Sequence, residues 1–160
     1  MLGDKCEIIK ISLPIKSFWA KEMNLDLDEL LSDGILKENY RLEMINWSDK
    51  MREQDYGCFC RVACQSAKKK PIWIVSDIRR ETDMRWFKEN YGDRIRAIKL
   101  VADENTRKER GFLYKSGIDD VASECGLDNY NDWDLIINNG KDRESIEKQL
   151  EKIISLIPKQ

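Results

Sequence analysis

The segment Pro71-Ile-Trp-Ile-Val-Ser-Asp77-Ile-Arg79-Arg80 decides the fold class of this 160-residue chain. Residues 71–76 form a nearly continuous apolar run, which is typical of a strand that is covered on both faces of a sheet. A carboxylate and two guanidinium groups follow at the end of that run. Open α/β sheets bind their ligands at the carboxyl ends of parallel strands. The segment therefore predicts a buried strand that leads into a charged site.

The segments on either side alternate between strand and helix patterns. Further strands are predicted at residues 7–12, 94–102 and 134–137, and helices at 15–22, 26–31, 36–51, 55–67, 81–90, 103–110 and 142–157. Strands separated by helices favour a parallel α/β sheet. Residues 115–131 have an irregular pattern, whereas the apolar stripe of residues 142–157 predicts a helix packed on the core. No repeat, low-complexity segment or linker interrupts the chain, so we expect one domain over residues 1–160.

Charge and residue usage exclude several classes of function. The chain has 28 Lys and Arg against 30 Asp and Glu, a formal net charge of −2, which argues against a general nucleic-acid binder. It has no histidine, which removes Ser-His-Asp and Cys-His catalytic systems and most catalytic zinc sites. Phosphoryl transfer, which relies on Arg, Lys, Asp and a bound metal, is compatible with this composition. No apolar run approaches the roughly 18 residues of a membrane span.

The five cysteines favour a reduced, cytosolic chain, because their number is odd and no secretory signal precedes them. Three of them form the cluster Cys58-x-Cys60-x3-Cys64. A metal site there would lack a C-x-x-C pair and would need a distant fourth ligand. We therefore expect structural thiols.

The charged residues after the apolar strand each have two interpretations. Asp77 can hold the hydration shell of Mg²⁺ or can cap a helix through a backbone N–H group, and by itself the cap is favoured. Arg79 and Arg80 can contact two different phosphates, or can form a solvated pair with Glu81 and Asp83. The two interpretations of the arginine pair are evenly balanced.

Other basic residues and one turn also have two interpretations. Lys37 and Arg41 share a helical face and Arg52 follows, which by itself favours a charged outer face. Arg107 and Arg110 end a charged helix that is either a mobile lid over phosphates or a match to the helix dipole, the latter weakly favoured. Asn138-Asn139-Gly140 suits a tight turn, with or without a ligand at its amides.

Taken together, these segments resemble the animal-type phosphomevalonate kinases over residues 2–156. The most specific matching pieces are Pro71 to Arg80, Arg85-Trp-Phe-Lys-Glu89, Glu124-Cys-Gly-Leu-Asp-Asn129, Gly57-Cys-Phe-Cys-Arg61 and Glu43-Met-Ile-Asn-Trp47. The resemblance implies a P-loop, nucleoside-monophosphate-kinase-like fold with three layers around a parallel sheet. It also implies transfer of the ATP γ-phosphoryl group to 5-phosphomevalonate, which gives diphosphomevalonate in the mevalonate pathway to isoprenoids and sterols.

The resemblance also implies roles for individual residues. Those that would surround the substrate carboxylate and phosphate are Lys16, Lys37, Arg41, Arg52, Arg79 and Arg80, with Asn139 nearby. Arg107 and Arg110 resemble lid arginines that meet the ATP phosphates, and Gln149 falls near the nucleotide. Arg79, and with it Arg110, is the candidate for stabilising charge on the transferred group.

The same resemblance implies Mg²⁺ with ATP as co-substrate. It further implies a monomer whose partners are small molecules, with no nucleic acid and no membrane, located in the cytoplasm. Some relatives end in a peroxisomal tripeptide, which Pro158-Lys159-Gln160 is not.

The chain departs from the family pattern at its front. The family carries a strand, a P-loop and a helix before the region that matches Leu2, and the 160 residues contain no G-x-x-x-x-G-K-[ST] motif. We therefore expect a truncated domain without its central strand, in which 7–12 and 71–76 form one half-sheet and 94–102 and 134–137 form the other. Unpaired strand edges would leave the chain weakly stable, or the halves would close up.

The missing P-loop also bears on activity. Without its backbone and lysine to position phosphates, turnover is expected to stay below about 10⁻³ of a complete relative. The alternative function is that of a non-catalytic paralogue, which binds anions or nucleotides without a P-loop.

Overall fold

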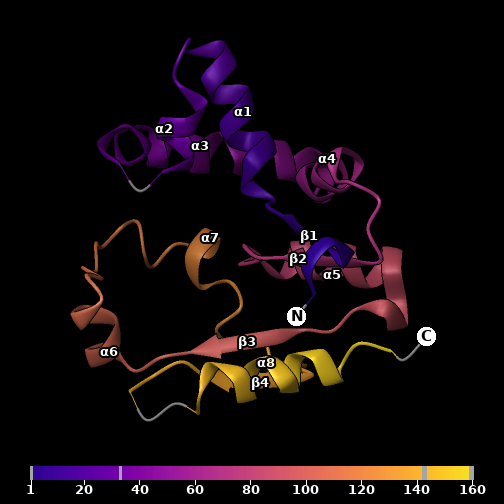
Figure 1. The fold of residues 1–160 in the computed structure, drawn as a ribbon. Helices are drawn as coiled ribbons and strands as arrows, with labels where there is room; N and C mark the ends of the chain where they lie inside the picture. Colours follow the sequence, from indigo (N-terminus) through magenta and orange to yellow (C-terminus); the bar gives the residue numbers. More distant parts are fainter. Residues whose placement is uncertain (1, 33, 142–143, 159–160) are drawn as a thin grey trace.

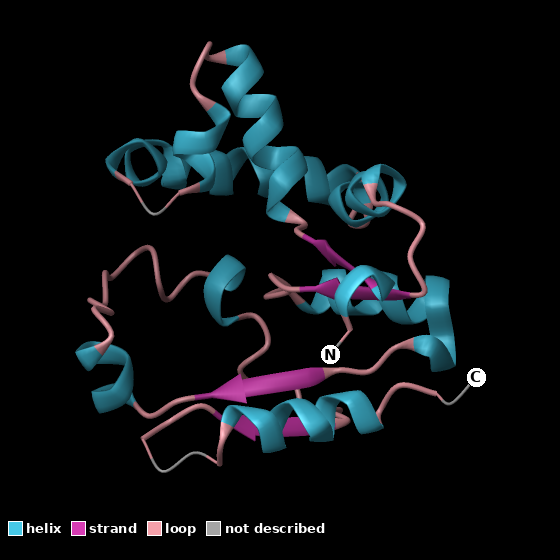
Figure 2. Cartoon of the chain, in the orientation of Figure 1, coloured by secondary structure: helices cyan, strands magenta, loops and turns pink. Residues whose placement is uncertain are grey.

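The computed structural model describes residues 2–32, 34–141 and 144–158, and it consists of two small parallel sheets flanked by helices (Figures 1 and 2). The strands are β1 (Cys6–Ile9), β2 (Ile72–Val75), β3 (Ile98–Val101) and β4 (Leu135–Asn138). The helices are α1 (Ser12–Glu22), α2 (Leu27–Leu31), α3 (Ile35–Gln54), α4 (Cys58–Ser66), α5 (Glu81–Tyr91), α6 (Glu104–Glu109), α7 (Ala122–Cys125) and α8 (Ile146–Ser155), with short 3₁₀ turns at Gly3–Lys5 and Gly92–Arg94.

The strand pairing is parallel in both sheets. β1 pairs with β2, which places Cys6 opposite Ile72, and β3 pairs with β4, which places Ile98 opposite Leu135. Helices α1 to α4 connect the strands of the first pair, and α6 and α7 lie between those of the second. The prediction of an α/β fold with these two parallel half-sheets is confirmed.

The two sheets remain separate. Among the described residues no strand joins β2 to β3, although Figure 1 shows these two as the inner strands, with β1 and β4 outside them. Apolar side chains stay exposed on the strands, with Ile8 and Leu100 each at 64%. The two sheets have not closed up against each other. The other expected consequence of the unpaired edges, a weakly stable chain, stays a prediction.

The first strand is shorter than predicted, because helix α1 begins within residues 7–12. β1 ends at Ile9 and α1 starts at Ser12. Pro14 lies in the first turn of α1, where proline is tolerated because its missing N–H has no partner within the helix. The predicted strand therefore extends too far at its carboxyl end, and the predicted helix at 15–22 starts too late.

The main core lies between α4, α5 and the β1–β2 sheet. Its buried members are Ile9, Ile11, Phe59, Cys60, Ala63, Cys64, Trp86 and Phe87. The five cysteines are free thiols, and burial raises the pKa of the Cys60 and Cys64 thiols. The cysteine cluster on α4 thus contributes two side chains to the hydrophobic core, in line with structural thiols.

Helix α8 packs less closely than its apolar stripe predicted. It begins at Ile146 after Ser145, whose hydroxyl accepts the backbone N–H of Lys148 at 3.4 Å, and residues 142–143 lie outside the described part of the chain. None of its residues is buried, and Ile146 and Leu150 are 54% and 37% exposed. A sheet of two strands offers this helix little apolar surface, so the expected core packing is wrong. No helix in the described residues is long and apolar enough to span a bilayer.

Candidate functional site

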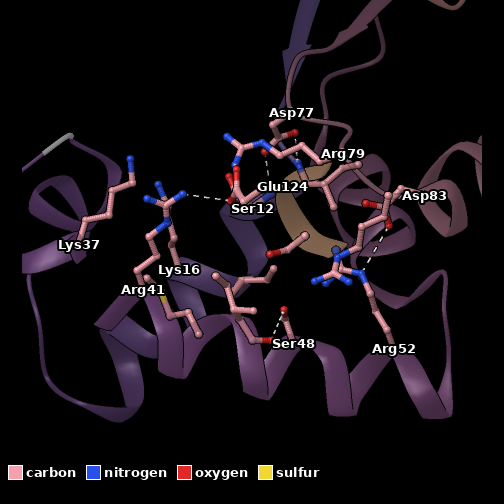
Figure 3. A pocket seen from close by; sticks show the side chains of 16 residues that line it. Ser12, Lys16, Lys37, Arg41, Ser48, Arg52, Asp77, Arg79, Asp83 and Glu124 are labelled. Atoms are coloured by element: carbon pink, nitrogen blue, oxygen red, sulfur yellow. Dashed lines mark hydrogen bonds and ion pairs between the residues drawn. The ribbon is translucent and has the colours of Figure 1, made fainter. Parts of the chain in front are cut away.

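A cavity of about 230 Å³ lies between α1, α3, α7 and the segment that follows β2 (Figure 3). Figure 3 shows Arg41 and Arg52 rising from α3 on its two sides, with Arg79 on the opposite wall. The lining combines cations with three carboxylates, Asp77, Asp83 and Glu124. Its apolar part comes from Ile11, Ile15, Met44 and Ile45.

The cavity brings together the six basic residues expected around an anionic substrate. Its basic lining residues are Lys16 on α1, Lys37, Arg41 and Arg52 on α3, and Arg79 and Arg80 after β2. They come from three segments separated by up to 64 positions in the chain, since 80 − 16 = 64. The structure thus places them together, and their roles in binding stay a prediction.

One face of α3 supplies three of these cations. The lining residues of this helix are 37, 41, 44, 45, 48 and 52, a spacing of three and four that follows one side of an α-helix. The side chains of Arg41 and Arg52 are only 21% and 10% exposed. By itself the charge pattern of α3 favoured a solvated outer face, and that interpretation is wrong because this face lines the cavity.

Asp77 caps a helix, but not the one that follows it in the sequence. Its two carboxylate oxygens accept the backbone N–H groups of Ile11 at 2.7 Å and Ser12 at 2.9 Å. The carboxylate therefore satisfies two of the backbone donors that a helix start leaves without partners. Within the described residues no group of three or more potential ligand side chains is arranged to hold a metal ion. A water-mediated contact of Asp77 with Mg²⁺ stays a prediction.

The tandem arginines pair with different elements. Arg79 donates to Glu124 on α7, and Arg80 donates to Asp49 on α3. Their pairing with Glu81 and Asp83, which the sequence suggested, is not the arrangement observed. Burial lowers the pKa of Arg80, and the charge of Asp49 opposes that shift. Each arginine thereby ties the end of β2 to another wall of the cavity.

Glu124 lies among the cations in the cavity. It forms ion pairs with Arg79 and with Arg41, whose Nη2 is 3.2 Å from Glu124 Oε1. Asp119 adds a second carboxylate 3.4 Å from the same Arg41 nitrogen. Two arginine forks that converge on one carboxylate form a site suited to an anionic group of an incoming molecule.

The sequence of the chain matches known proteins in the region that builds this cavity. Residues 1–93 match the phosphomevalonate kinase family. The chain is also 47% identical, over 159 residues, to the phosphomevalonate kinase of Drosophila melanogaster, and the match covers 95% of this chain and 84% of that protein. The chain belongs to the phosphomevalonate kinase family. The resemblance drawn from its motifs is confirmed, and the family is one of enzymes, the transferases that act as kinases.

The part of the chain that matches the phosphomevalonate kinase family includes all six cavity cations, since the last of them, Arg80, precedes residue 93. Four other predicted site residues lie outside the cavity lining: Arg107, Arg110, Asn139 and Gln149. Arg107 and Arg110 are in or next to α6, which Figure 1 shows beyond one end of β3. The roles of these four residues in a phosphomevalonate kinase stay predictions.

The local contacts of two of these residues are structural. The guanidinium of Arg107 lies over the Phe112 ring, 5.1 Å from its centre. Gln149 Nε2 donates to the carbonyls of Asn138 at 2.9 Å and Glu144 at 3.1 Å. These contacts stabilise the end of α6 and the beginning of α8.

Two site residues of this family member were not predicted from its sequence. Glu124 was noted only as part of a matching motif, and Asp83 only as a partner for solvated arginines. Their partners Arg41 and Arg52 lie 83 and 31 positions earlier (124 − 41 and 83 − 52). Local pattern reasoning carries no signal for such pairs. Asp83 alone offered a hint of burial. It lies in the first turn of α5, and the apolar residues Met84, Trp86 and Phe87 follow it in the same helix.

Proposed function

We propose that this chain binds 5-phosphomevalonate in the basic cavity, as the acceptor of the ATP γ-phosphoryl group in the reaction that gives diphosphomevalonate. The observation that carries the proposal is the convergence of six cations in one cavity. The substrate carries a phosphate and a carboxylate, so it needs several cations in fixed positions. Arginine forks match both groups bidentately.

The proposed chemistry requires positioning and charge stabilisation rather than a protein nucleophile. Arg79 stabilises the charge that develops on the transferred group, with Arg110 as a second cation from the nucleotide side. Arg107 and Gln149 contact ATP, and Asn139 lies near the acceptor. Mg²⁺ would accompany ATP as part of the co-substrate, and Asp77 would contact its water shell. A chain without histidine is compatible with this mechanism, because no step needs an imidazole.

We also propose that the two sheets are halves of one P-loop, nucleoside-monophosphate-kinase-like sheet in a single domain over residues 1–160, missing its central strand. The parallel direction of all four strands and the separation of β2 from β3 support this arrangement. In the complete sheet, a strand between β2 and β3 would pair with both inner edges. The chain is proposed to act as a cytoplasmic monomer.

Without a P-loop motif, the 160 residues are proposed to bind the acceptor substrate without efficient turnover. The phosphate cradle of P-loop enzymes is built from backbone N–H groups and a lysine of that motif. The rate is therefore expected below about 10⁻³ of that of a complete enzyme. The second candidate function is that of a non-catalytic anion- or nucleotide-binding member of the family, and a basic cavity in 160 residues without a P-loop motif supports it.

Calorimetry with 5-phosphomevalonate, together with ADP release in the presence of MgATP, tests the proposal. The Drosophila phosphomevalonate kinase is the positive control, and an R41Q/R79Q double variant is the control for binding in the cavity. Binding that the double variant loses supports the assignment of the cavity, and its absence in the unmodified chain overturns it. Turnover within tenfold of the positive control would contradict the expected inactivity and the non-catalytic candidate.

A further inference from the structure

Behind the cavity, at the start of α5, lies a buried carboxylate that the proposed mechanism does not use. Asp83 is 3% exposed, and it is one of the residues that line the cavity. It is the third residue of α5, directly after the segment that carries Arg79 and Arg80. Charged side chains are almost never buried to this extent unless they are paired.

The partners of Asp83 link it to the floor of the cavity. Asp83 Oδ1 lies 3.5 Å from Arg52 Nε, and the thiol of the fully buried Cys60 donates to the same oxygen at 3.5 Å. The Arg52 guanidinium also lies over the Phe59 ring, 4.7 Å from its centre. Arg52 thus lies between an aromatic face and a carboxylate, and the contact of its buried Nε with Asp83 is an ion pair without a hydrogen bond.

The charges around Arg52 make this carboxylate necessary. Burial lowers the pKa of Arg80; the charge of Asp49 opposes that shift, and the nearby guanidinium charge of Arg52 adds to it. Burial raises the pKa of Asp83, while the charge of Arg52 opposes the shift. Removing the negative charge would leave Arg52 buried without compensation, which is strongly destabilising for that geometry.

We infer that Asp83 is a positioning residue for the acceptor site, because its buried carboxylate holds the Arg52 guanidinium at the place where an anionic group of the substrate binds. The inference deepens the proposed function and rests on it. Asp83 does not touch the substrate itself. It acts through Arg52, and it offsets the repulsion between Arg52 and Arg80 in the empty cavity.

A double-mutant cycle tests this inference through the Kd for 5-phosphomevalonate. D83N keeps the shape of the side chain and is expected to raise the Kd at least about tenfold, because one partner of a buried charge pair is lost. In an R52Q background the same substitution is expected to change the Kd less than twofold, since the group that it positions is gone. Equal effects in both backgrounds, or an unchanged Kd in folded D83N, would overturn the inference.

The matched control is D55N, because Asp55 pairs with the half-exposed Arg61 outside the cavity. It is expected to leave the Kd unchanged. If D83N does not fold, as judged by near-ultraviolet circular dichroism, D83E replaces it. Glutamate keeps the charge but displaces the carboxylate by one methylene, and the Kd is again expected to rise. A folded D83E with the Kd of the unmodified chain would contradict the positioning role.

A second readout separates this inference from the proposed function. The Nε–H resonance of Arg52 is shifted by the Phe59 ring current when the guanidinium is held in place. In ligand-free D83N it is expected to move to the position of an exposed arginine, and in D55N to stay. If the unmodified chain binds no 5-phosphomevalonate, the proposed function fails, whereas this resonance still decides whether Asp83 positions Arg52.

Discussion

At the scale of single residues, the cavity balances its cations with carboxylates of different exposure. The side chain of Asp83, which pairs with Arg52, is 4% exposed, whereas that of Glu124, which pairs with Arg41 and Arg79, is 18% exposed. A carboxylate that pairs with two arginines occupies the space that an anionic ligand needs. We therefore predict that Glu124 competes with an anionic ligand, whereas Asp83 supports its binding.

E124Q is expected to strengthen the binding of inorganic phosphate about three- to tenfold. The ligand no longer has to displace a charged group from Arg41 and Arg79, so the charge-assisted contacts are available to it. Calorimetry at low ionic strength measures the change, with D128N as the control, since Asp128 is an exposed acid of the same segment outside the cavity. Weaker binding in E124Q would show that Glu124 orients the arginines instead.

The raised pKa of Tyr91 predicts that the folded chain loses stability at alkaline pH. Burial, followed by its contact with Cys64, raises the pKa of Tyr91 to about 12, whereas an unfolded tyrosine titrates near 10. A folded pKa above the unfolded one means that the stabilisation is present below pH 10 and is lost between about pH 10 and 12. The difference in unfolding free energy between the unmodified chain and Y91F, followed by urea denaturation across this range, is expected to shrink. A constant difference would contradict the shift.

At the scale of elements, the α4–α5 contact and the single face of α3 hold the cavity in place. α4 begins after Gly57, and any side chain at that position would overlap the Trp86 indole on α5. α5 in turn carries Asp83 and follows the tandem arginines. The close approach of these two helices therefore bears on how Asp83 and the tandem arginines sit against α3.

G57A is expected to lower the unfolding free energy by about 1–3 kcal/mol, because the added methyl group overpacks the helix contact. G34A is the control, since its methyl group would meet only the Ser32 hydroxyl, at 3.0 Å. Urea denaturation of both variants gives the comparison. A G57A variant as stable as G34A would show that the Trp86 indole moves aside at little cost.

At the scale of the whole molecule, the two sheets are separate, and no strand of the described residues pairs with both of them. The inner strands β2 and β3 have no partner on their facing edges among the described residues. Such backbone groups need water or another strand, since a buried unpaired group costs about 1–3 kcal/mol. Helix α5 contributes to both apolar clusters of the described residues, the main core with α4 and a second cluster of Met84, Ala97 and Leu127, so packing rather than a continuous sheet joins the two sheets.

The unfolding free energy of the chain is expected to be low, below about 5 kcal/mol, at the lower limit for native domains. Saturating 5-phosphomevalonate is expected to raise the melting temperature, because it binds only the folded state. Calorimetric and urea unfolding, each with and without the ligand, measure both quantities. An unfolding free energy above about 10 kcal/mol without ligand would contradict the proposed cost of the unpaired strand edges.

The sequence by itself determined the order of strands and helices, because apolar periodicity is a local property of the chain. Residues 71–76 were readable as a buried strand for this reason. The same patterns misplaced the start of α1, which depends on the cap that Asp77 supplies. They also overestimated the packing of α8, which depends on how many strands the neighbouring sheet has. Which strands pair with which was implied by the resemblance to the kinase family, and the structure shows those pairs.

Only the tertiary structure decided which face of α3 is functional. A row of lysine and arginine residues on a helix looks the same in sequence whether water or a cavity lies beside it. It also decided that Asp77 caps α1, that Glu124 bridges Arg41 and Arg79, and that Asp83 supports Arg52. These contacts join residues between 31 and 83 positions apart, and such pairings arise from the packing of distant elements, which no local spacing encodes.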